Sequence, residues 1–356
     1  MYKVVAIFFM LIIFVMPVRA LTTSGDGVIL MDQDSGRVLY SKNMHKEKLI
    51  ASTTKIMTAL LAIESNQLDD IVTIDDSILK SYGSSIYIEI GEEISLRNLV
   101  YGLMLRSGND AAIAIANYLG GIDYFVEKMN DKAKSLGMVN TKFINPHGLD
   151  EETSNISTAY DMALLTKYAN QYDEYKKIVS TQKYIVKTNY KTYAWFNKNK
   201  LLTFYKYTTG GKTGYTEKAN RTLVTTASKN NLNLIVVTLD DSNDWNTHKT
   251  LYEYGFSNYY NYRILNKTTF NVDSNYYKET LYIENDYYYP LQIGETDNMV
   301  IKIKLDKMKK YQNKTKVGVA SIYYKEELVH EENIYIRIPE SNTKTLWQRL
   351  LEWLGR

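Results

Sequence analysis

The stretch Ala51-Ser-Thr-Thr-Lys-Ile-Met-Thr58 is the most informative part of the sequence, and it opens a helical pattern over residues 52–65. Residues i and i+3 of a helix share a face, so the amine of Lys55 can reach the hydroxyl of Ser52. Serine is a weak nucleophile until a base takes its proton, and lysine can be that base when its pKa is lowered. The start of a helix adds free N–H groups near a developing oxyanion. Because Ser-x-x-Lys is common by chance, it indicates acyl transfer only together with other motifs.

Two further motifs follow along the chain. The first, Ser107-Gly108-Asn109, precedes an alanine-rich helical run and by itself indicates only a helix N-terminus. The second, Lys212-Thr213-Gly214, follows two glycines that would let a peptide backbone come close, although a hairpin turn is the simpler interpretation. The three motifs are separated by 55 and then 105 residues, and this order resembles the signature of penicillin-binding proteins and class A β-lactamases.

Longer strings around these motifs narrow the resemblance. Over residues 25–262 the sequence resembles the low-molecular-mass D-alanyl-D-alanine carboxypeptidases, which are penicillin-binding serine peptidases. The strings that carry the resemblance are Ala51-Ser-Thr-Thr-Lys-Ile-Met-Thr58, Leu105-Arg-Ser-Gly-Asn-Asp-Ala-Ala112, Asn145-Pro-His-Gly-Leu149, Ser157-Thr-Ala-Tyr-Asp161 and Gly211-Lys-Thr-Gly-Tyr-Thr216.

The resemblance implies roles for the catalytic residues. Ser52 would attack the carbonyl between the two D-alanines of a peptidoglycan stem peptide and form an acyl-enzyme, with Lys55 as general base. Ser107 would relay a proton toward the leaving D-alanine, while Asn109 would hold the substrate amide and Lys55 in place. Water would then release the shortened peptide, and no metal or organic cofactor is implied.

The resemblance also implies the substrate-binding residues. Lys212 would lower the pKa of Lys55 by its charge and attract the terminal carboxylate, which the Thr213 hydroxyl would bind. Gly214 belongs to the same motif, and the backbone N–H groups of Ser52 and Tyr215 would form the oxyanion hole. The implied partners are the peptidoglycan stem peptide and, as covalent inhibitors, β-lactam antibiotics.

The chain departs from the family's pattern near the carboxylate site. Ile50 stands where the family often has proline, and Ala219-Asn220 stands where Ala-Gly is common. Several members carry an arginine shortly before the Gly-Phe that ends the domain, but here Gly255-Phe256 is preceded by Asp244-Trp245-Asn246. The sequence therefore predicts that this carboxylate-supporting arginine is missing and that substrate affinity or preference differs.

Composition excludes several classes of function. The 356 residues include no cysteine, which excludes disulfides, thiolate catalysis and cysteine-ligated metal centres. Four scattered histidines argue against a histidine-rich metal site, and a formal net charge of +3 is too small for a nucleic-acid-binding surface. Hydrophobic residues make up 45% of the chain, so it can build a sizeable core. The 32 tyrosines suggest no function beyond packing flat against strands.

The order of predicted elements indicates the fold class. Two strands around a glycine turn, a block of helices and three later strands imply an α/β (α+β) domain with one sheet, which the resemblance makes penicillin-binding-protein/β-lactamase-like. Short alternating strands then predict a small C-terminal all-β domain. The strands are expected at 27–40, 182–186, 222–227 and 233–239, and the helices at 52–65, 96–118, 123–137 and 161–175. The predicted divisions are 1–20, 21–262 for the catalytic domain, 263–339 for the β-rich domain and 340–356.

Both ends of the chain carry targeting signals. Lys3 precedes an apolar run, and Val18-x-Ala20 offers small side chains to a signal peptidase, so residues 1–20 are predicted to be a signal peptide. An uncleaved anchor is the alternative. Residues 340–356 are predicted to form a basic amphipathic helix in the membrane interface, although it could instead dock on its own protein. We therefore expect an exported protein on the outer face of the bacterial cytoplasmic membrane, with no nucleic-acid partner.

Three other functions stay open. A serine β-lactamase shares the motifs and needs a second base, for which Glu151 and Asn155 have the right spacing within a carboxypeptidase-like context. A DD-endopeptidase that cleaves cross-links would use the same scaffold. A non-catalytic wall-binding or penicillin-sensing module would be expected to have lost a motif residue, and none is lost. His147 lies in a Pro-His-Gly turn, where a structural role is expected rather than pairing with a catalytic serine.

Overall fold

The computed structural model describes residues 21–150 and 152–338. The predicted signal peptide, Glu151 and the predicted terminal helix at 340–356 lie outside the described residues. Among the described residues, no helix combines the length and the apolar character needed to span a bilayer.

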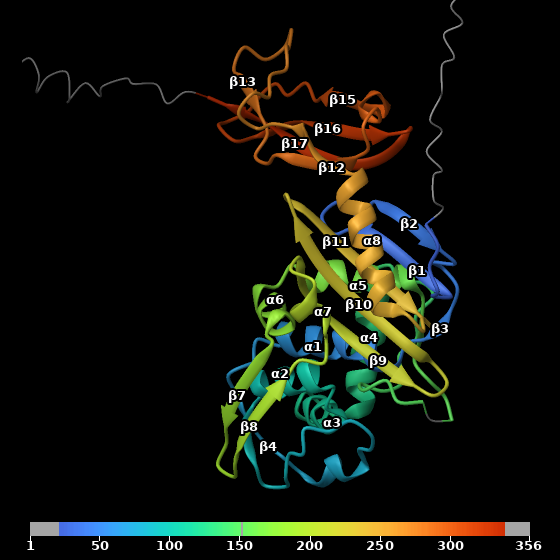
Figure 1. Cartoon of the computed structure of the whole chain (residues 1–356). Coiled ribbons are helices and arrows are strands. Elements are labelled where there is room, and N and C mark those ends of the chain that lie inside the picture. Colours follow the sequence, from blue (N-terminus) through green and yellow to red (C-terminus); the bar gives the residue numbers. More distant parts are fainter. Residues whose placement is uncertain (1–20, 151, 339–356) are drawn as a thin grey trace, which may run out of the picture.

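A five-stranded antiparallel sheet forms the centre of the catalytic part (Figure 1). Its strand order is β2-β1-β11-β10-β9, so the first two strands of the chain complete a sheet built mainly from a later segment. The bounds are β1 (Gly27–Asp32), β2 (Val38–Lys42), β9 (Thr208–Thr216), β10 (Asn220–Lys229) and β11 (Leu232–Leu239). The strands predicted at 27–40, 222–227 and 233–239 are therefore confirmed.

Strand β1 is apolar from Val28 to Met31, and both of its faces are buried there. Ile29 and Met31 pack into the core under the helical block, whereas Val28 and Leu30 pack into a second core with α8 (Asp244–Asn258). Figure 1 shows α8 across one face of the sheet and α5 (Ala159–Ala169) against the other.

Most of the remaining helices pack into the core on the α5 side of the sheet, whereas Leu201 of α7 (Leu201–Phe204) packs into the core shared with α8. The bounds of the others are α1 (Lys55–Glu64), α2 (Leu96–Arg106), α3 (Asn109–Tyr118), α4 (Ile122–Ser135) and α6 (Asp173–Ser180), with the 3₁₀ turns η1 (Ala51–Thr54) and η2 (Asp76–Lys80).

Two predicted helices are each divided. The prediction of one helix over 96–118 is wrong because Ser107 has a left-handed φ of 66°, which ends α2 before α3 begins. The prediction over 161–175 is wrong because α5 ends at Ala169 and a new helix starts at Asp173, whose carboxylate favours a helix N-terminus. The first break matters for the site, because Ser107 contacts Lys212 and Asn109 contacts Lys55 on its two sides.

Three two-stranded sheets surround the central one, so the prediction of a single sheet is wrong. They pair β3 (Lys48–Leu49) with β6 (Ile156–Ser157), β4 (Ile71–Thr73) with β5 (Glu93–Ser95), and β7 (Lys183–Lys187) with β8 (Thr192–Phe196). The strand β8 has no counterpart among the predicted elements.

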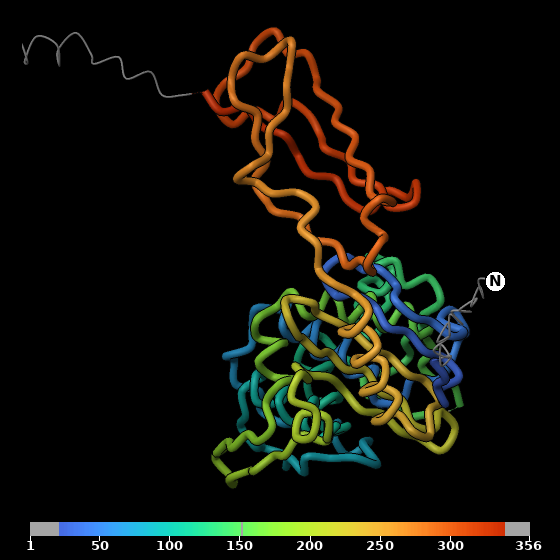
Figure 2. The backbone as a smooth tube through the Cα atoms, turned by 45° about the horizontal axis from the view of Figure 1, so that its top comes forward, coloured from blue at the N-terminus to red at the C-terminus, as the bar shows by residue number. Residues whose placement is uncertain are grey.

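A β-rich module, residues 260–338, follows α8 and projects away from the catalytic part (Figure 2). In it β12 (Tyr260–Leu265) pairs with β14 (Tyr287–Leu291), and four strands form a sheet in the order β13-β17-β16-β15. The bounds are β13 (Thr280–Tyr282), η3 (Thr296–Asn298), β15 (Met299–Leu305), β16 (Lys316–Tyr324) and β17 (Glu327–Arg337). The predicted division between residues 262 and 263 falls inside β12.

Arg37, in the turn between β1 and β2, connects the catalytic part to this module. Its guanidinium donates to the Pro290 carbonyl and lies 3.0 Å from the Glu295 carboxylate. It also donates to the Tyr324 hydroxyl at 2.8 Å and lies 4.3 Å from the centre of the Tyr324 ring. A guanidinium group suits such a site, because it donates hydrogen bonds within its plane and stacks its flat face on aromatic rings.

Candidate active site

Ser52 lies on a 3₁₀ turn. The turn η1 covers residues 51–54 and α1 begins at Lys55, so the predicted regular helix starts one turn later than expected. Residues i and i+3 of a 3₁₀ turn eclipse each other, and Lys55 Nζ accordingly lies 3.0 Å from Ser52 Oγ.

Lys55 is fully buried, and three oxygen atoms surround its amine. Besides Ser52 Oγ, Nζ lies 2.7 Å from Asn109 Oδ1 and 2.5 Å from the His147 carbonyl oxygen. These two oxygens can only accept hydrogen bonds. A neutral amine that donates its two N–H groups to them has its lone pair left for the Ser52 hydroxyl proton. The geometry therefore suits Lys55 as the base that activates Ser52.

Burial favours the neutral form of this amine. The pKa of Lys55 lies well below its usual 10.5, first because burial disfavours the ammonium form and second because Lys212 and Lys198 are nearby cations. A base that is neutral at physiological pH can accept the serine proton directly.

Lys212 lies on β9, against Ser107. Its Nζ is 3.1 Å from Ser107 Oγ and donates to the Thr213 carbonyl oxygen at 2.7 Å. Burial lowers the pKa of Lys212 to about 7, and the charge of Lys198 adds to the effect. The Ser107 hydroxyl therefore contacts a lysine that can hold or release a proton near neutral pH.

Asn109 connects Lys55 to a neighbouring loop. Its Oδ1 accepts from Lys55, and its Nδ2 donates to the Tyr82 carbonyl oxygen at 2.6 Å. An amide nitrogen has two N–H groups, so one remains for a substrate carbonyl.

Strand β9 is the edge strand of this sheet among the described residues, and an edge strand can pair with an extended peptide. A Cβ on Gly214 would lie 2.3 Å from Thr222 Oγ1 and 3.0 Å from the Ser52 backbone nitrogen, so only glycine fits there. This close approach brings the β9 backbone beside the Ser52 N–H, the first of the two donors predicted for the oxyanion hole. The side chain of the next residue, Tyr215, is 62% exposed.

The turn at 145–149 supplies the carbonyl that contacts Lys55. Gly148 has a φ of +82°, and a Cβ there would lie 1.9 Å from the Ala51 carbonyl oxygen. The His147 ring accepts from the Leu149 N–H at 3.1 Å, and burial lowers the pKa of His147 to about 3. His147 therefore acts through its main-chain carbonyl, a contact that the sequence motifs did not indicate.

A cleft of about 370 Å³ lies over Ser52, and Ser107, Thr213 and Tyr215 line it. Lys198 and Lys200 also line it, so its walls favour an anionic group on the ligand.

Arg221 lines the same cleft and was not singled out from the sequence. It lies on β10, directly opposite Tyr215, and donates to both Asp244 carboxylate oxygens at 2.7 and 2.9 Å. Its guanidinium also lies 5.5 Å from the Trp245 ring centre. The sequence-based prediction of a missing arginine concerned only the segment before Gly255-Phe256, and it did not anticipate an arginine that reaches the cleft from β10. Asp244 lies in the segment before Gly255-Phe256, where several family members carry an arginine. In this chain it instead accepts hydrogen bonds from Arg221 of β10.

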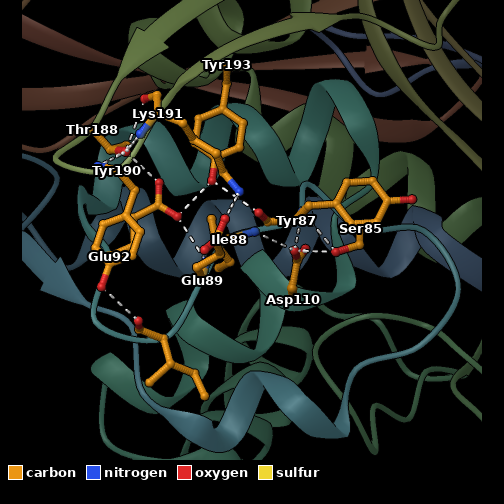
Figure 3. A network of polar contacts seen from close by, with 11 residues as sticks. Ser85, Tyr87, Ile88, Glu89, Glu92, Asp110, Thr188, Tyr190, Lys191 and Tyr193 are labelled. Carbon is orange, nitrogen blue, oxygen red and sulfur yellow. Dashed lines mark hydrogen bonds and ion pairs between the residues drawn. The ribbon is translucent and has the colours of Figure 1, made fainter.

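Residues 82–92 form a loop beside the cleft, held by two carboxylates (Figure 3). Asp110 accepts the backbone N–H groups of Ile86 and Tyr87 at 3.0 and 2.8 Å. Glu92, which is fully buried, accepts the Tyr193 hydroxyl at 2.8 Å. Through these bonds the loop is fixed both to α3 and to the β7–β8 hairpin.

Asn155 has a structural role in this region. Its amide donates to Thr54 Oγ1 at 2.9 Å and to the Asn145 carbonyl at 3.0 Å, while its Oδ1 accepts a hydrogen bond from the Ile144 N–H.

Within residues 21–150 and 152–338, no group of three acidic or histidine side chains is arranged to hold a metal ion.

A serine hydroxyl that lies 3.0 Å from the amine of a fully buried lysine is the arrangement of a serine hydrolase that works by acyl transfer. The chain belongs to the D-alanyl-D-alanine carboxypeptidase family of peptidases, S11, whose model matches residues 15–243.

Individual relatives agree with this assignment. D-alanyl-D-alanine carboxypeptidase DacF of Bacillus subtilis is 39% identical over 216 residues, which make up 59% of this chain and 55% of that protein. A D-alanyl-D-alanine endopeptidase of Pseudomonas aeruginosa is 34% identical over 230 residues, 62% of this chain and 73% of that protein. The solved structure of penicillin binding protein 5 from Haemophilus influenzae matches with a TM-score of 0.74 at 26% identity, covering 90% of this chain and 98% of that chain. The family resemblance and the fold class of the described parts are thereby confirmed.

Proposed function

We propose that this protein is a serine-type D-Ala-D-Ala carboxypeptidase that removes the terminal D-alanine from peptidoglycan stem pentapeptides and is inhibited by penicillin. The observation that carries the proposal is the buried Lys55 amine, whose two other bonds leave its lone pair for Ser52. The family membership supports the choice of substrate.

The proposed reaction has two acyl-transfer steps. Ser52 Oγ attacks the carbonyl carbon between the two D-alanines while its proton passes to Lys55. The carbonyl oxygen becomes an oxyanion that accepts hydrogen bonds from the backbone N–H groups of Ser52 and Tyr215. The C–N bond then breaks, the proton held by Lys55 passes through the Ser107 hydroxyl to the leaving amine, and an ester remains on Ser52. Water attacks this ester as Lys55 takes a proton from it, and Lys55 returns that proton to Ser52 Oγ as the ester bond breaks, which releases the shortened peptide and restores Ser52.

The test is a mass measurement on residues 21–356, the proposed exported form. We expect release of D-alanine from a stem pentapeptide and a penicilloyl adduct on Ser52 that lasts minutes or longer. An adduct that clears within seconds would favour a β-lactamase instead, and the absence of any adduct would overturn the mechanism.

We propose that Arg221, with the Thr213 hydroxyl and the charge of Lys212, binds the terminal carboxylate of the substrate. The double variant Arg221→Gln/Asp244→Asn removes this cation without leaving a lone buried charge. We expect KM for the pentapeptide to rise roughly 10- to 100-fold with little change in kcat, because the carboxylate is bound alike in ground and transition states. Steady-state D-alanine release checks this, with Lys134→Gln on α4 as control. An unchanged KM would exclude Arg221 from substrate binding.

A DD-endopeptidase activity is the second candidate, supported by the name of the Pseudomonas relative. Comparing D-alanine release from the pentapeptide with cleavage of a cross-linked dimer distinguishes the two activities.

We also propose that the protein is exported and works on the outer face of the bacterial cytoplasmic membrane. Residues 1–20 would direct export, and the amphipathic segment at 340–356 would lie in the membrane interface. The proposed substrate, which lies outside that membrane, supports this location.

A further inference from the structure

Basic charge is concentrated in one segment of the β-rich module. Residues 301–316, here called the lysine-rich end, carry seven lysines and a single acidic residue, Asp306, in a chain with a net charge of only +3. The other residues of 263–338 carry five basic and ten acidic side chains, so the charge of the module is segregated. The lysines are Lys302, Lys304, Lys307, Lys309, Lys310, Lys314 and Lys316. All seven are exposed, and none forms an ion pair with another described residue.

This segment lies at the end of the module that is far from the catalytic part. Strand β16 runs from Lys316 to Tyr324, and Tyr324 contacts Arg37 of the catalytic part. A strand rises about 3.3 Å per residue, which places Lys316 roughly 25 Å from that contact. The antiparallel pairing of β15 with β16 brings Leu305 to the same far end, opposite Gly318. Figure 2 shows the module extending in this direction.

The described chain also ends there. Ile338, directly after β17, donates its N–H to Asn313 Oδ1 at 3.1 Å, and the Lys314 N–H donates to the Ile336 carbonyl at 2.9 Å. Residues 339–356, with the predicted amphipathic segment, therefore continue from a point beside the lysine-rich end.

Apolar and tyrosine side chains are exposed among these lysines. Met308, which lies between two of the lysines, is 37% exposed, and Ile303 on β15 is 43% exposed. Tyr276 is 42% exposed, and its hydroxyl donates to the Met308 carbonyl at 2.8 Å. Lysines mixed with tyrosines and single apolar side chains are typical of surfaces that lie at the level of lipid headgroups.

Lysine on an edge strand has a common alternative role, which is to prevent pairing with another chain. That role can explain Lys302 and Lys304, which lie on the edge strand β15. It does not explain the lysines at 307–314, which follow the strand in the loop before β16.

We propose that the lysine-rich end docks on the surface of anionic phospholipid bilayers, with Met308 and Tyr276 among the headgroups. This inference rests on the proposed location at the membrane, but it involves residues other than the terminal segment. Each lysine near an anionic bilayer adds a favourable electrostatic contribution that salt weakens.

Docking at this end would hold the cleft away from the lipid. The cleft residue Thr213 lies on β9, and the strand pairings across the sheet, through Leu223 and Thr238, place it level with Val28. Val28 is near the start of β1, whereas Arg37, which contacts the module, comes after the end of that strand. The cleft and the contact with the module are therefore at opposite ends of β1, so the cleft lies farther from the bilayer than the Arg37 contact does.

The experiment measures co-sedimentation of residues 21–356 with vesicles of phosphatidylcholine, with and without 30% phosphatidylglycerol, at low and high salt. The test variant is Lys307→Glu/Lys309→Glu/Lys310→Glu. A matched control, Lys134→Glu/Lys142→Glu/Lys187→Glu, makes the same charge change at exposed lysines of the catalytic part. Both are also made with Leu350→Glu/Leu354→Glu, which weakens the proposed terminal anchor within the full chain.

We expect the test variant to bind phosphatidylglycerol vesicles at least tenfold more weakly than the control, with or without the terminal substitutions, and the difference to shrink at high salt. The triple glutamine variant should show an intermediate loss. Equal binding by test and control variants would overturn the proposal. So would binding of the parent chain to soluble polyphosphate but not to the vesicles, which would indicate an anionic polymer. Vesicle binding is read without catalysis, so it is independent of whether D-alanine release or the penicillin adduct is found.

Discussion

The Lys55→Met variant is expected to acylate Ser52 on the order of 10²–10⁴-fold more slowly than the parent chain, as is typical when a general base is lost. Methionine matches the length and burial of the lysine stem but offers no amine lone pair to the Ser52 proton. Penicilloyl adduct formation at a fixed penicillin concentration, followed by mass spectrometry over time, measures this rate.

Two companion variants make the result specific. The Ser52→Ala variant should form no penicilloyl adduct and therefore serves as the negative control. Lys134→Met, at an exposed position on α4, should acylate at the parent rate. Thermal unfolding of each variant shows whether it is folded, since Lys55→Met leaves the His147 carbonyl and Asn109 Oδ1 without their donor. A folded Lys55→Met protein that acylates within tenfold of the parent would mean that another group is the base.

The residues proposed to carry the chemistry could be singled out from the sequence because each lies in a short motif with its own local geometry. Ser52 and Lys55 share a turn, and spacing alone brings their side chains together. Gly214 is required by a close backbone approach, which the glycines around Lys212 already indicated. That these motifs converge came from the resemblance, because no local pattern places Lys212 against Ser107.

The parts that were missed depend on contacts between distant segments. Arg221 and Asp244 look like ordinary surface residues in sequence, and only the β10–β9 register and the start of α8 bring their pair to the cleft. The His147 contact is made by a main-chain carbonyl, which has no side-chain signature. Ser107 was identified as a site residue, but its left-handed conformation was not, because nothing in its side chain predicts a positive φ.

The tyrosines show a related limit. Tyr324 is explained by stacking under Arg37 between the two parts of the molecule, and Tyr276 by its place beside the lysine-rich end. Both explanations require a partner far away in sequence. Composition alone therefore supports only the general statement that tyrosine packs well on strands.

Lys212 should control the pH dependence of acylation in two opposite ways. Burial first, and then the positive charge of Lys212, lower the pKa of Lys55, so the rising, acid-side limb of kcat/KM lies well below the usual lysine range. Lys212 itself has a pKa lowered to about 7, so its charge, which attracts the substrate carboxylate, is lost as the pH rises through that value. Because kcat/KM reports the free enzyme, the parent chain should show a bell-shaped profile with its falling limb near pH 7.

Substitution of Lys212 separates these two limbs. In Lys212→Gln the missing charge lets the pKa of Lys55 rise, so the acid-side limb should move to higher pH, and the falling limb should disappear. At pH 7 the acylation rate of this variant should be roughly 10²–10³-fold below that of the parent, as when a preorganised polar contact to the reacting group is removed. At pH 9 part of the lost acylation rate should be recovered. Lys212→Arg keeps a charge that does not titrate, so its falling limb should also disappear while its acid-side limb stays near that of the parent. Stopped-flow acylation between pH 5 and 10 distinguishes these profiles. A Lys212→Gln profile with the parent's bell shape would show that neither limb depends on Lys212, and that the pKa of Lys55 is set by its burial and its other neighbours.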